Sequence, residues 1–359
     1  MILVSGCQFA APGDRAGSND QCFTQPCETV CPAGETCSPD TPVGLFFASD
    51  SLFGELFGSA GPHPVAEGGT QRIQVFRDKD GFTPFSPFDA TATTPIEITQ
   101  VDAPSVTVRG GAAGSGFLRI IDPDDGALHD RIAIQVLPIT SARITDTSMA
   151  LFDWEGSETL DLALFAGSGV SLGLLLYGGE STRLVDYSTT FTITGDAMEG
   201  GDVALWDQRS VTVGASGSVS VSVKTGSGMP FDVTMPVVDK IDDIVAIKNV
   251  FSKDLSQPLD VGSEQMVCFR GMADTRVVAG LSWVFSGEGQ IEAKTLDAMC
   301  ASIKPLAVGN ASIVVEAGGM TKSFPVTMKA SAKANAPVEK ASFPREVHLG
   351  PTPGERAND

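Results

Sequence analysis

A strand pattern that recurs three times, at a spacing of about 100 residues, constrains the fold of this chain more than any other feature. Each copy has an alternating apolar stretch, a glycine turn, a second alternating strand, another turn and a closing strand. The copies begin with SVTVRGG (105–111), SVTVGASG (210–217) and KPLAVGNA (304–311). In an extended chain, period-2 alternation puts the apolar side chains on one face, as in GSVSVSVK (217–224). We therefore predict three similar β-sandwiches.

The helical alternative is weak, because no window of eleven or more residues sustains the apolar stripe of an amphipathic helix. A repeat of about 100 residues matches the roughly seven strands of an immunoglobulin-type sandwich, so the predicted fold class is all-β with three tandem Ig-like sandwiches. We place these at 42–139, 140–239 and 240–329. A small cysteine-rich segment at 8–41 precedes them, and a tail at 330–359 is predicted to be disordered. The short junctions predict a semi-rigid rod.

The stretch Val4-Ser5-Gly6-Cys7 resembles the lipobox at which bacterial signal peptidase II cuts before the cysteine is acylated. The resemblance implies that residues 1–7 are the remnant of a lipoprotein signal and that Cys7 is lipidated. A signal peptide needs a basic region and about 7–15 apolar residues, whereas six residues precede Cys7. Either the true start lies further upstream, or the match arises by chance. By resemblance to other lipoproteins, Gln8 implies the outer membrane of a Gram-negative cell.

Four of the seven cysteines lie within 8–41, among polar residues that cannot build a core. They are Cys22, Cys27, Cys31 and Cys37. Two disulfides are the predicted solution, with three possible connectivities, and a zinc site is the alternative. The remaining pair, Cys268 and Cys300, is predicted to form a third disulfide, which would stabilise its domain by roughly 3–4 kcal/mol in the chain-entropy model.

The charge balance excludes one class of partner. The chain has 24 Lys and Arg against 44 Asp and Glu, a formal net charge of −20. This charge repels phosphate backbones, so we expect no nucleic-acid binding, and it opposes docking on anionic lipid. No apolar run approaches the roughly 18–20 residues of a spanning helix, which leaves an N-terminal lipid anchor as the predicted link to a membrane.

The third repeat resembles a bacterial Ig-like (Big) domain of intimin- and invasin-type adhesins. The residues that carry the resemblance are Val261-Gly262, Leu281-Ser282-Trp283 and the run VGNASI at 308–313. It implies a sandwich with Trp283 in the core on strand C. Because Cys300 follows Trp283 too closely for strand F, a bridge between strands B and E is expected. The resemblance is nearly silent on the ligand.

Few residues offer catalytic chemistry. The three histidines, His63, His129 and His348, lie in separate regions. The run Gly169-Val-Ser171-Leu-Gly173 matches the G-x-S-x-G nucleophile elbow, but that motif requires a strand-to-helix turn, and a short apolar run and two glycines follow it here. We interpret it as a glycine-rich turn and predict no catalytic residues and no cofactor.

Two groups of carboxylates are weak candidates for calcium, which takes 6–8 oxygen ligands. They are Asp122, Asp124 and Asp125 in one turn, and Asp239, Asp242 and Asp243 at a predicted junction. Both groups are equally typical of solvated turns and linkers, so no metal site is assigned.

These features together predict an exported, non-enzymatic bacterial lipoprotein of the cell envelope, at the outer membrane or cell surface. Its Ig-like domains would serve adhesion, matrix contact or envelope structure by binding a protein or polysaccharide that the sequence does not identify. The alternative is a polysaccharide-binding or calcium-dependent accessory module of a larger surface complex.

Overall fold

The computed structural model describes residues 45–49, 63–77, 83–153, 156, 159–179, 182–200, 207–248 and 252–331. The predicted all-β class is confirmed, since nearly all regular structure in this part of the chain is strand. Cys7, the four cysteines of 8–41 and almost all of the predicted tail lie outside the described residues.

The first sandwich lies within residues 45–137 and consists of two four-stranded sheets. The first sheet has the order β1 (Phe46–Ser49), β3 (Thr70–Phe76), β6 (Ser105–Gly110) and β5 (Ile96–Asp102). The second has the order β2 (Val65–Ala66), β8 (Leu128–Leu137), β7 (Gly114–Ile121) and β4 (Asp89–Ala92). Apolar side chains of both sheets, such as Ile73 and Leu118, are fully buried and form one core cluster.

The second sandwich follows after three residues. Its five-stranded sheet contains β12 (Thr182–Leu184), β11 (Gly169–Gly178), β15 (Gln208–Val213) and β14 (Ala197–Glu199), with β9 (Ser141–Asp146) also on β11. The facing strands are β13 (Thr190–Gly195), β16 (Ser218–Lys224), β17 (Pro230–Val238) and β10 (Leu162–Phe165). Between β9 and β10 the short helix α2 (Thr147–Phe152) begins after Asp146, whose carboxylate accepts from the Ser148 amide as an N-cap.

The third sandwich has a four-stranded sheet in the order β19 (Leu259–Asp260), β26 (Met320–Lys329), β25 (Gly309–Ala317) and β22 (Trp283–Glu288). The facing strands are β21 (Arg276–Ala279), β20 (Gln265–Ala273), β24 (Cys300–Pro305) and β23 (Ile291–Asp297), with β18 (Asp243–Ala246) paired to β20. Trp283 is half-buried at the start of β22 and stacks on Phe285, with ring centroids 6.1 Å apart.

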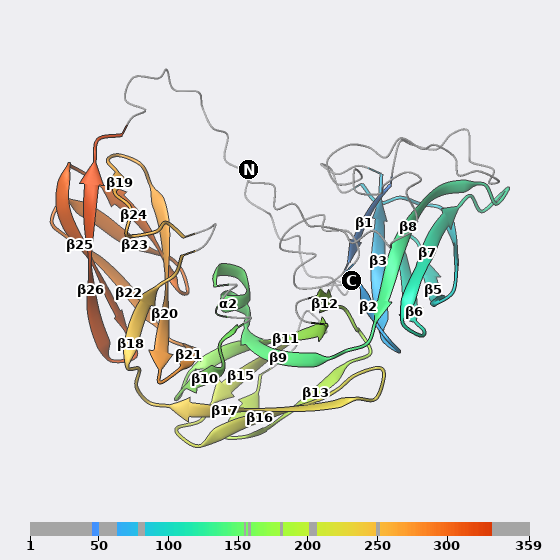
Figure 1. Ribbon diagram of the computed structural model, residues 1–359, viewed down its shortest axis with the longest axis horizontal. Helices are drawn as coiled ribbons and strands as arrows, with labels where there is room; N and C mark the ends of the chain where they lie inside the picture. Colours follow the sequence, from blue (N-terminus) through green and yellow to red (C-terminus); the bar gives the residue numbers. More distant parts are fainter. Residues whose placement is uncertain are drawn as a thin grey trace, which may run out of the picture.

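One sheet continues from the second sandwich into the third, a feature that the sequence did not indicate. Strand β10 pairs in parallel with β17 on one side and with β21 on the other, through partners such as Leu162 and Val277. The result is a nine-stranded sheet, visible where β17, β10 and β21 lie side by side (Figure 1). A single core cluster crosses the joint, because it contains both Leu164 and Cys300.

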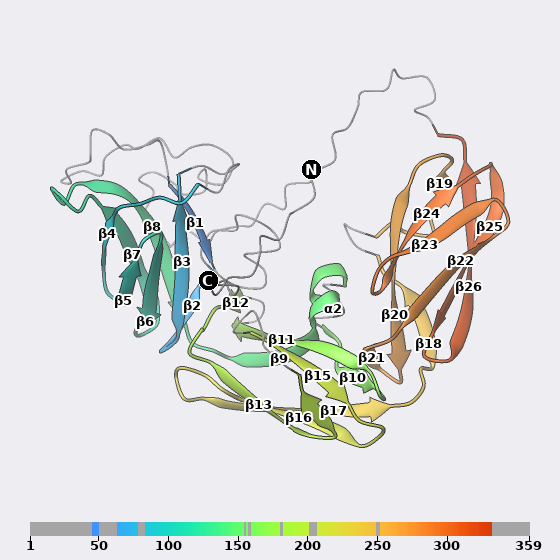
Figure 2. The ribbon, with the colours of Figure 1, turned by 180° about the vertical axis from the view of Figure 1, so that it is seen from behind.

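The three sandwiches follow an open arc, with the first and third on either side of the second (Figures 1 and 2). The predicted rod is therefore bent at its junctions.

The alternation that founded the repeat prediction has the expected effect in β16, where Val219, Val221 and Val223 are buried and the intervening serines are not. In the third copy the strand lies earlier than predicted. The predicted stretch begins at Lys304, whereas β24 already ends at Pro305, which has no N–H to donate to the ladder. The turn that follows leaves Leu306 and Val308 exposed.

Candidate functional site

A cavity of about 260 Å³ opens at the end of the first sandwich where the β7–β8 turn lies against the segment before β4. Its lining residues are Arg77, Phe85, Ser86, Pro87, Asp122, Pro123, Asp124 and His129. We call this the tip pocket. It brings together an aromatic ring, a guanidinium, an imidazole and two carboxylates, which is the mixture of apolar wall and polar groups that small-molecule sites use.

The acidic turn of the tip pocket is shaped by its own carboxylates. Asp122 Oδ1 accepts a hydrogen bond of 2.8 Å from the Asp124 amide, and Asp125 Oδ1 accepts one of 2.7 Å from the Ala127 amide. Gly126 has φ +72°, a left-handed conformation that glycine adopts without strain. The structure thus places these three sequence-predicted acids in a hydrogen-bonded turn, as their Asp-rich pattern permits.

His129 lines the tip pocket. Its ring meets Phe85 edge-on with centroids 5.1 Å apart, and its Nε2 lies 3.7 Å from Asp122 Oδ2. The Arg77 guanidinium lies over the Phe85 ring at 5.4 Å. His129 Nδ1 is buried and has no hydrogen-bond partner among the described residues. The arrangement offers hydrogen-bond donors and acceptors around one apolar wall.

The second acidic group is spread along the start of the third sandwich. Asp243 Oδ1 lies 2.6 Å from Lys322 Nζ, and this hydrogen bond holds the pKa of the Asp243 carboxyl below its usual value. Asp242 Oδ2 accepts from the Asp274 amide at 2.8 Å. Within the described ranges, no three His, Cys, Asp or Glu side chains form a group that could hold a metal ion.

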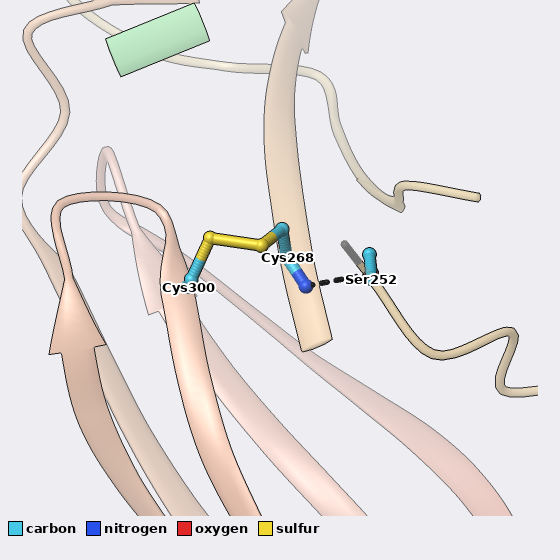
Figure 3. Close-up of a disulfide and its surroundings, with 3 residues drawn as sticks. All are labelled: Ser252, Cys268 and Cys300. Atoms are coloured by element: carbon cyan, nitrogen blue, oxygen red, sulfur yellow. Dashed lines mark hydrogen bonds between the residues drawn. A yellow bond between two sulfur atoms is a disulfide. The ribbon is translucent and has the colours of Figure 1, made fainter. Parts of the chain in front are cut away.

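Cys268 and Cys300 form a disulfide, as the sequence predicted, and Figure 3 shows the bond together with Ser252. The two residues are direct partners on neighbouring antiparallel strands β20 and β24, with Cα atoms 4.0 Å apart. The Ser252 hydroxyl accepts from the Cys268 amide at 2.9 Å. Both cysteines are fully buried in the cluster that joins the second and third sandwiches.

Ser171, the only candidate nucleophile from the sequence, lies within strand β11 opposite Ser210 of β15. The strand continues for seven residues beyond it, to Gly178. A nucleophile elbow needs a sharp turn from strand to helix at the serine, so this segment does not form one.

The joint between the first and second sandwiches is a site that sequence reasoning missed. Asp186 is fully buried and accepts hydrogen bonds from the Thr70 amide of β3 at 3.1 Å and from the Gly226 amide at 2.7 Å. A parallel bridge pairs Val65 with Val185 beside it. In the sequence, the run VDYST (185–189) does not distinguish Asp186 from a surface turn residue. The two backbone donors, from Gly226 and Thr70, are 40 and 116 residues away.

His63 lies two residues before the start of β2. Burial, with a smaller contribution from the nearby Arg183 charge, lowers the pKa of His63 to about 4. The imidazole is therefore neutral at physiological pH.

No protein-family model matches the chain, and a search of curated proteins found no match. Among solved structures, the FdeC adhesin of Escherichia coli matches with 14% identity over 80% of this chain and 97% of that one, at a TM-score of 0.21. Domains 4–9 of the surface layer protein SbsC match with 11% identity over 80% of this chain and 47% of that one, at a TM-score of 0.27.

Invasin, a bacterial integrin-binding protein, matches with 11% identity over 82% of this chain and 60% of that one, at a TM-score of 0.19. An endo-fucoidan hydrolase of glycoside hydrolase family 107 matches at 13% identity over 75% of this chain and 43% of that one, with a TM-score of 0.22. With identities below 25% and TM-scores below 0.5, these likenesses carry no argument about the activity or partners of this chain. In the part of the chain that the structure describes, no helix is long and apolar enough to cross a membrane.

Proposed function

We propose that this chain is an exported, non-catalytic protein of a bacterial cell envelope, anchored through an acylated Cys7. Its tandem Ig-like sandwiches serve in adhesion, matrix contact or envelope structure, with a protein or polysaccharide as partner. The observation that carries the proposal is the way in which the sandwiches are joined.

Both joints are made by the backbone and by buried groups. The second and third sandwiches share a nine-stranded sheet through β10 and β21, and Arg270 of β20 forms an ion pair of 3.2 Å with the buried Asp153. The first and second are held by Asp186 and the Val65–Val185 bridge. Joints of this kind fix the orientation of neighbours, which suits display of a surface at a distance from an anchor.

The disulfide supports export. A buried Cys268–Cys300 bond persists in an oxidising compartment and is uncommon in a reducing cytosol. The Val-Ser-Gly-Cys run ending at Cys7 supports the lipid anchor, because acyl chains contribute about 0.8 kcal/mol per buried CH₂ without any spanning helix.

The test is mass spectrometry of the protein taken from its own membranes, with cysteines alkylated before and after reduction. We expect a diacylglyceryl mass on Cys7 and alkylation of the other six cysteines only after reduction. The matched variant Cys7→Ser should leave the membrane fraction while keeping the Cys268–Cys300 bond. An unlipidated chain with alkylatable thiols before reduction would overturn both the anchor and the compartment.

A second candidate function, ligand binding by an accessory module, is favoured by the tip pocket and its unpaired His129 Nδ1. Screening of oligosaccharides by thermal shift, with and without EDTA, tests it. A shift that His129→Phe abolishes would support this candidate, whereas no shift in any condition would count against it.

A further inference from the structure

The tip pocket lies at the end of the first sandwich that is opposite to its joint with the second sandwich. Strands β7 and β8 pair from Gly114 and Val136, beside β2 and the joint, to Ile121 and Leu128 at the far end. The turn at 122–127 joins the two strands there and contributes the acidic side of the pocket. Strand β8 then runs from this turn back toward β9 (Figure 1). A ligand in the pocket would therefore meet an end of the array rather than a joint between sandwiches.

One side of the tip pocket presents a hydrogen-bond donor and an acceptor next to each other. His129 Nε2 lies 3.7 Å from Asp122 Oδ2, a separation that exceeds the reach of a direct hydrogen bond. The side chain of His129 is 9% exposed, and its Nδ1 is buried without a hydrogen-bond partner among the described residues. Because Nε2 faces a carboxylate oxygen, the proton is placed on Nε2. A hydroxyl group beside this pair accepts from Nε2 and donates to Oδ2 at the same time.

Arg77 and Asp124 add a second donor and a second acceptor to the lining. The Arg77 guanidinium lies over the Phe85 ring at 5.4 Å, and this stacking uses the face of the guanidinium, so its N–H groups remain able to donate from the edge. The Asp124 carboxylate accepts hydrogen bonds. An occupant must therefore both accept and donate, as hydroxyl groups do. An ammonium group only donates and a carboxylate only accepts.

The rest of the lining is largely apolar and limits the size of the occupant. Pro87 and Pro123 are both exposed and line the tip pocket, together with Phe85 from the core of the first sandwich. The C–H face of a sugar ring is an apolar surface that packs against such side chains. The cavity of about 260 Å³ is slightly smaller than the roughly 300 Å³ at which sites for drug-sized ligands begin, so it accommodates about one sugar ring.

The charge of the lining selects among sugars. Two carboxylates, from Asp122 and Asp124, stand against one guanidinium, and the whole chain has a formal net charge of −20. A sulfated sugar or a uronic acid would bring another negative charge close to these carboxylates, which costs Coulomb energy. The pocket therefore favours an uncharged sugar.

We propose that the tip pocket binds one uncharged sugar unit of a glycan, with one hydroxyl group of the sugar bridging His129 Nε2 and Asp122 Oδ2. The proposal rests on the second candidate function, because it names the ligand of that accessory module. It makes the end of the first sandwich the place at which the array contacts its partner.

Asp122→Asn is the decisive variant. Asparagine keeps one oxygen that can accept from the Asp124 amide, as Oδ1 does at 2.8 Å, while an NH₂ group replaces the oxygen that faces His129. The matched control is Asp125→Asn in the same turn, because Asp125 lies outside the lining and its Oδ1 accepts from the Ala127 amide at 2.7 Å. Both substitutions remove one negative charge, so they differ only in the loss of the acceptor inside the pocket.

Binding is measured by NMR on the full chain, from saturation-transfer difference spectra and from titration of amide shifts. The probes are the methyl glycosides of glucose, galactose, mannose and N-acetylglucosamine. A ligand of this size is expected to bind with a Kd of about 1 mM and to shift the amides of Ser86 and Asp124. Asp122→Asn should weaken binding roughly ten- to hundred-fold, which is the effect of losing a hydrogen bond to a charged group. Asp125→Asn should leave the affinity unchanged.

A second variant keeps the test valid if Asp122→Asn fails to fold. Arg77 is exposed, so Arg77→Met should retain the fold, which circular dichroism reports, and it should also weaken binding because one donor is lost. Methyl glucuronide and glucosamine are the charged comparators. Tighter binding of either one than of the uncharged glycosides would overturn the proposal.

Two other results would overturn the proposal as well: no saturable shift with any of the four methyl glycosides, or equal affinities for Asp122→Asn and Asp125→Asn. A thermal shift by longer oligosaccharides that persists in Asp122→Asn would retain the accessory function but exclude the tip pocket as its site. The anchor at Cys7 is tested on native membranes, so failure of the sugar site leaves that result untouched.

Discussion

Asp186 makes the sharpest test of the joint between the first two sandwiches. Its side chain is 0% exposed, and five groups donate to its two oxygens. Oδ1 accepts from the amides of Thr70 and Ser188 and from the Ser188 hydroxyl. Oδ2 accepts from the Thr189 hydroxyl and the Gly226 amide, both at 2.7 Å. One carboxylate thereby connects three chain segments from two sandwiches.

Asp186→Asn keeps the shape of the side chain but replaces one of its two accepting oxygens with an NH₂ group, which donates hydrogen bonds. Whichever oxygen becomes the amide nitrogen, at least one buried backbone N–H loses its acceptor and faces another donor. A hydrogen bond to a charged group contributes about 1.5–3 kcal/mol, and an unsatisfied buried donor costs about 1–3 kcal/mol. We therefore expect the free energy of unfolding to fall by about 3–4 kcal/mol.

The assay is urea unfolding combined with amide hydrogen exchange. Thr70 and Gly226 lie on opposite sides of the joint, and both amides should lose protection by about 10²-fold, because 1.4 kcal/mol corresponds to a factor of ten. Asp232→Asn is the control, since Asp232 is exposed and accepts one bond of 2.7 Å from Ser222; its effect should stay within about 0.5 kcal/mol. Unchanged stability and exchange in Asp186→Asn would refute the reasoning.

Three further predictions concern other buried groups. Replacing Cys268 and Cys300 with serine should lower stability by roughly 3–4 kcal/mol, measured by urea unfolding against the oxidised chain. Arg270→Met should lower it by about 3 kcal/mol in the same assay, because Asp153, 1% exposed, loses its ion pair with the Arg270 guanidinium. For His63, NMR titration should give a midpoint near 4. Because this pKa lies below the usual value of 6.5, the unfolded chain binds the proton more readily than the folded chain. The contribution of His63 to stability is therefore complete above pH 6.5 and is lost as the pH falls toward 4. His63→Gln should remove this part of the pH dependence of unfolding.

The Arg270 test has a surface control. Lys294 and Glu292 also form an ion pair, but at 3.9 Å and with the lysine side chain 75% exposed. Lys294→Met should change stability by less than about 1 kcal/mol. Equal effects of the two substitutions would contradict the argument from burial.

Local alternation was enough to predict the strands, whereas pairing between distant strands was not predictable. Val219, Val221 and Val223 alternate with serines, so one face had to be buried. Strand β10 has a continuous apolar run from Leu162 to Phe165, which is typical of a strand covered on both faces. That run does not indicate which strands β10 pairs with, and one of them, β21, begins more than 100 residues later.

The candidate sites likewise divide into those formed by neighbouring residues, which were predictable, and those formed by distant residues, which were not. The Asp122 turn was visible because aspartates and glycine favour hydrogen-bonded turns, and the Cys268–Cys300 pair was visible by cysteine counting. The tip pocket was not, since His129 and Phe85 are separated in sequence and meet only after the sheets have packed.

Strand register also fixes the joint between the second and third sandwiches. A strand that slips by one residue turns every side chain to the opposite face, so β10 can pair with β17 and β21 in one register only. Leu164 is fully buried in that register and takes part in the core of both neighbours. The relative position of the second and third sandwiches is therefore set by the pairing of β10 with β17 and β21. Breaking the pairing of β10 with β17 must therefore also loosen the third sandwich, so we expect Ala166→Pro, which removes the N–H that donates to Val238, to lower the stability of both sandwiches in urea unfolding. Glu67→Pro, next to the Val65–Val185 bridge, should act on the first and second sandwiches instead.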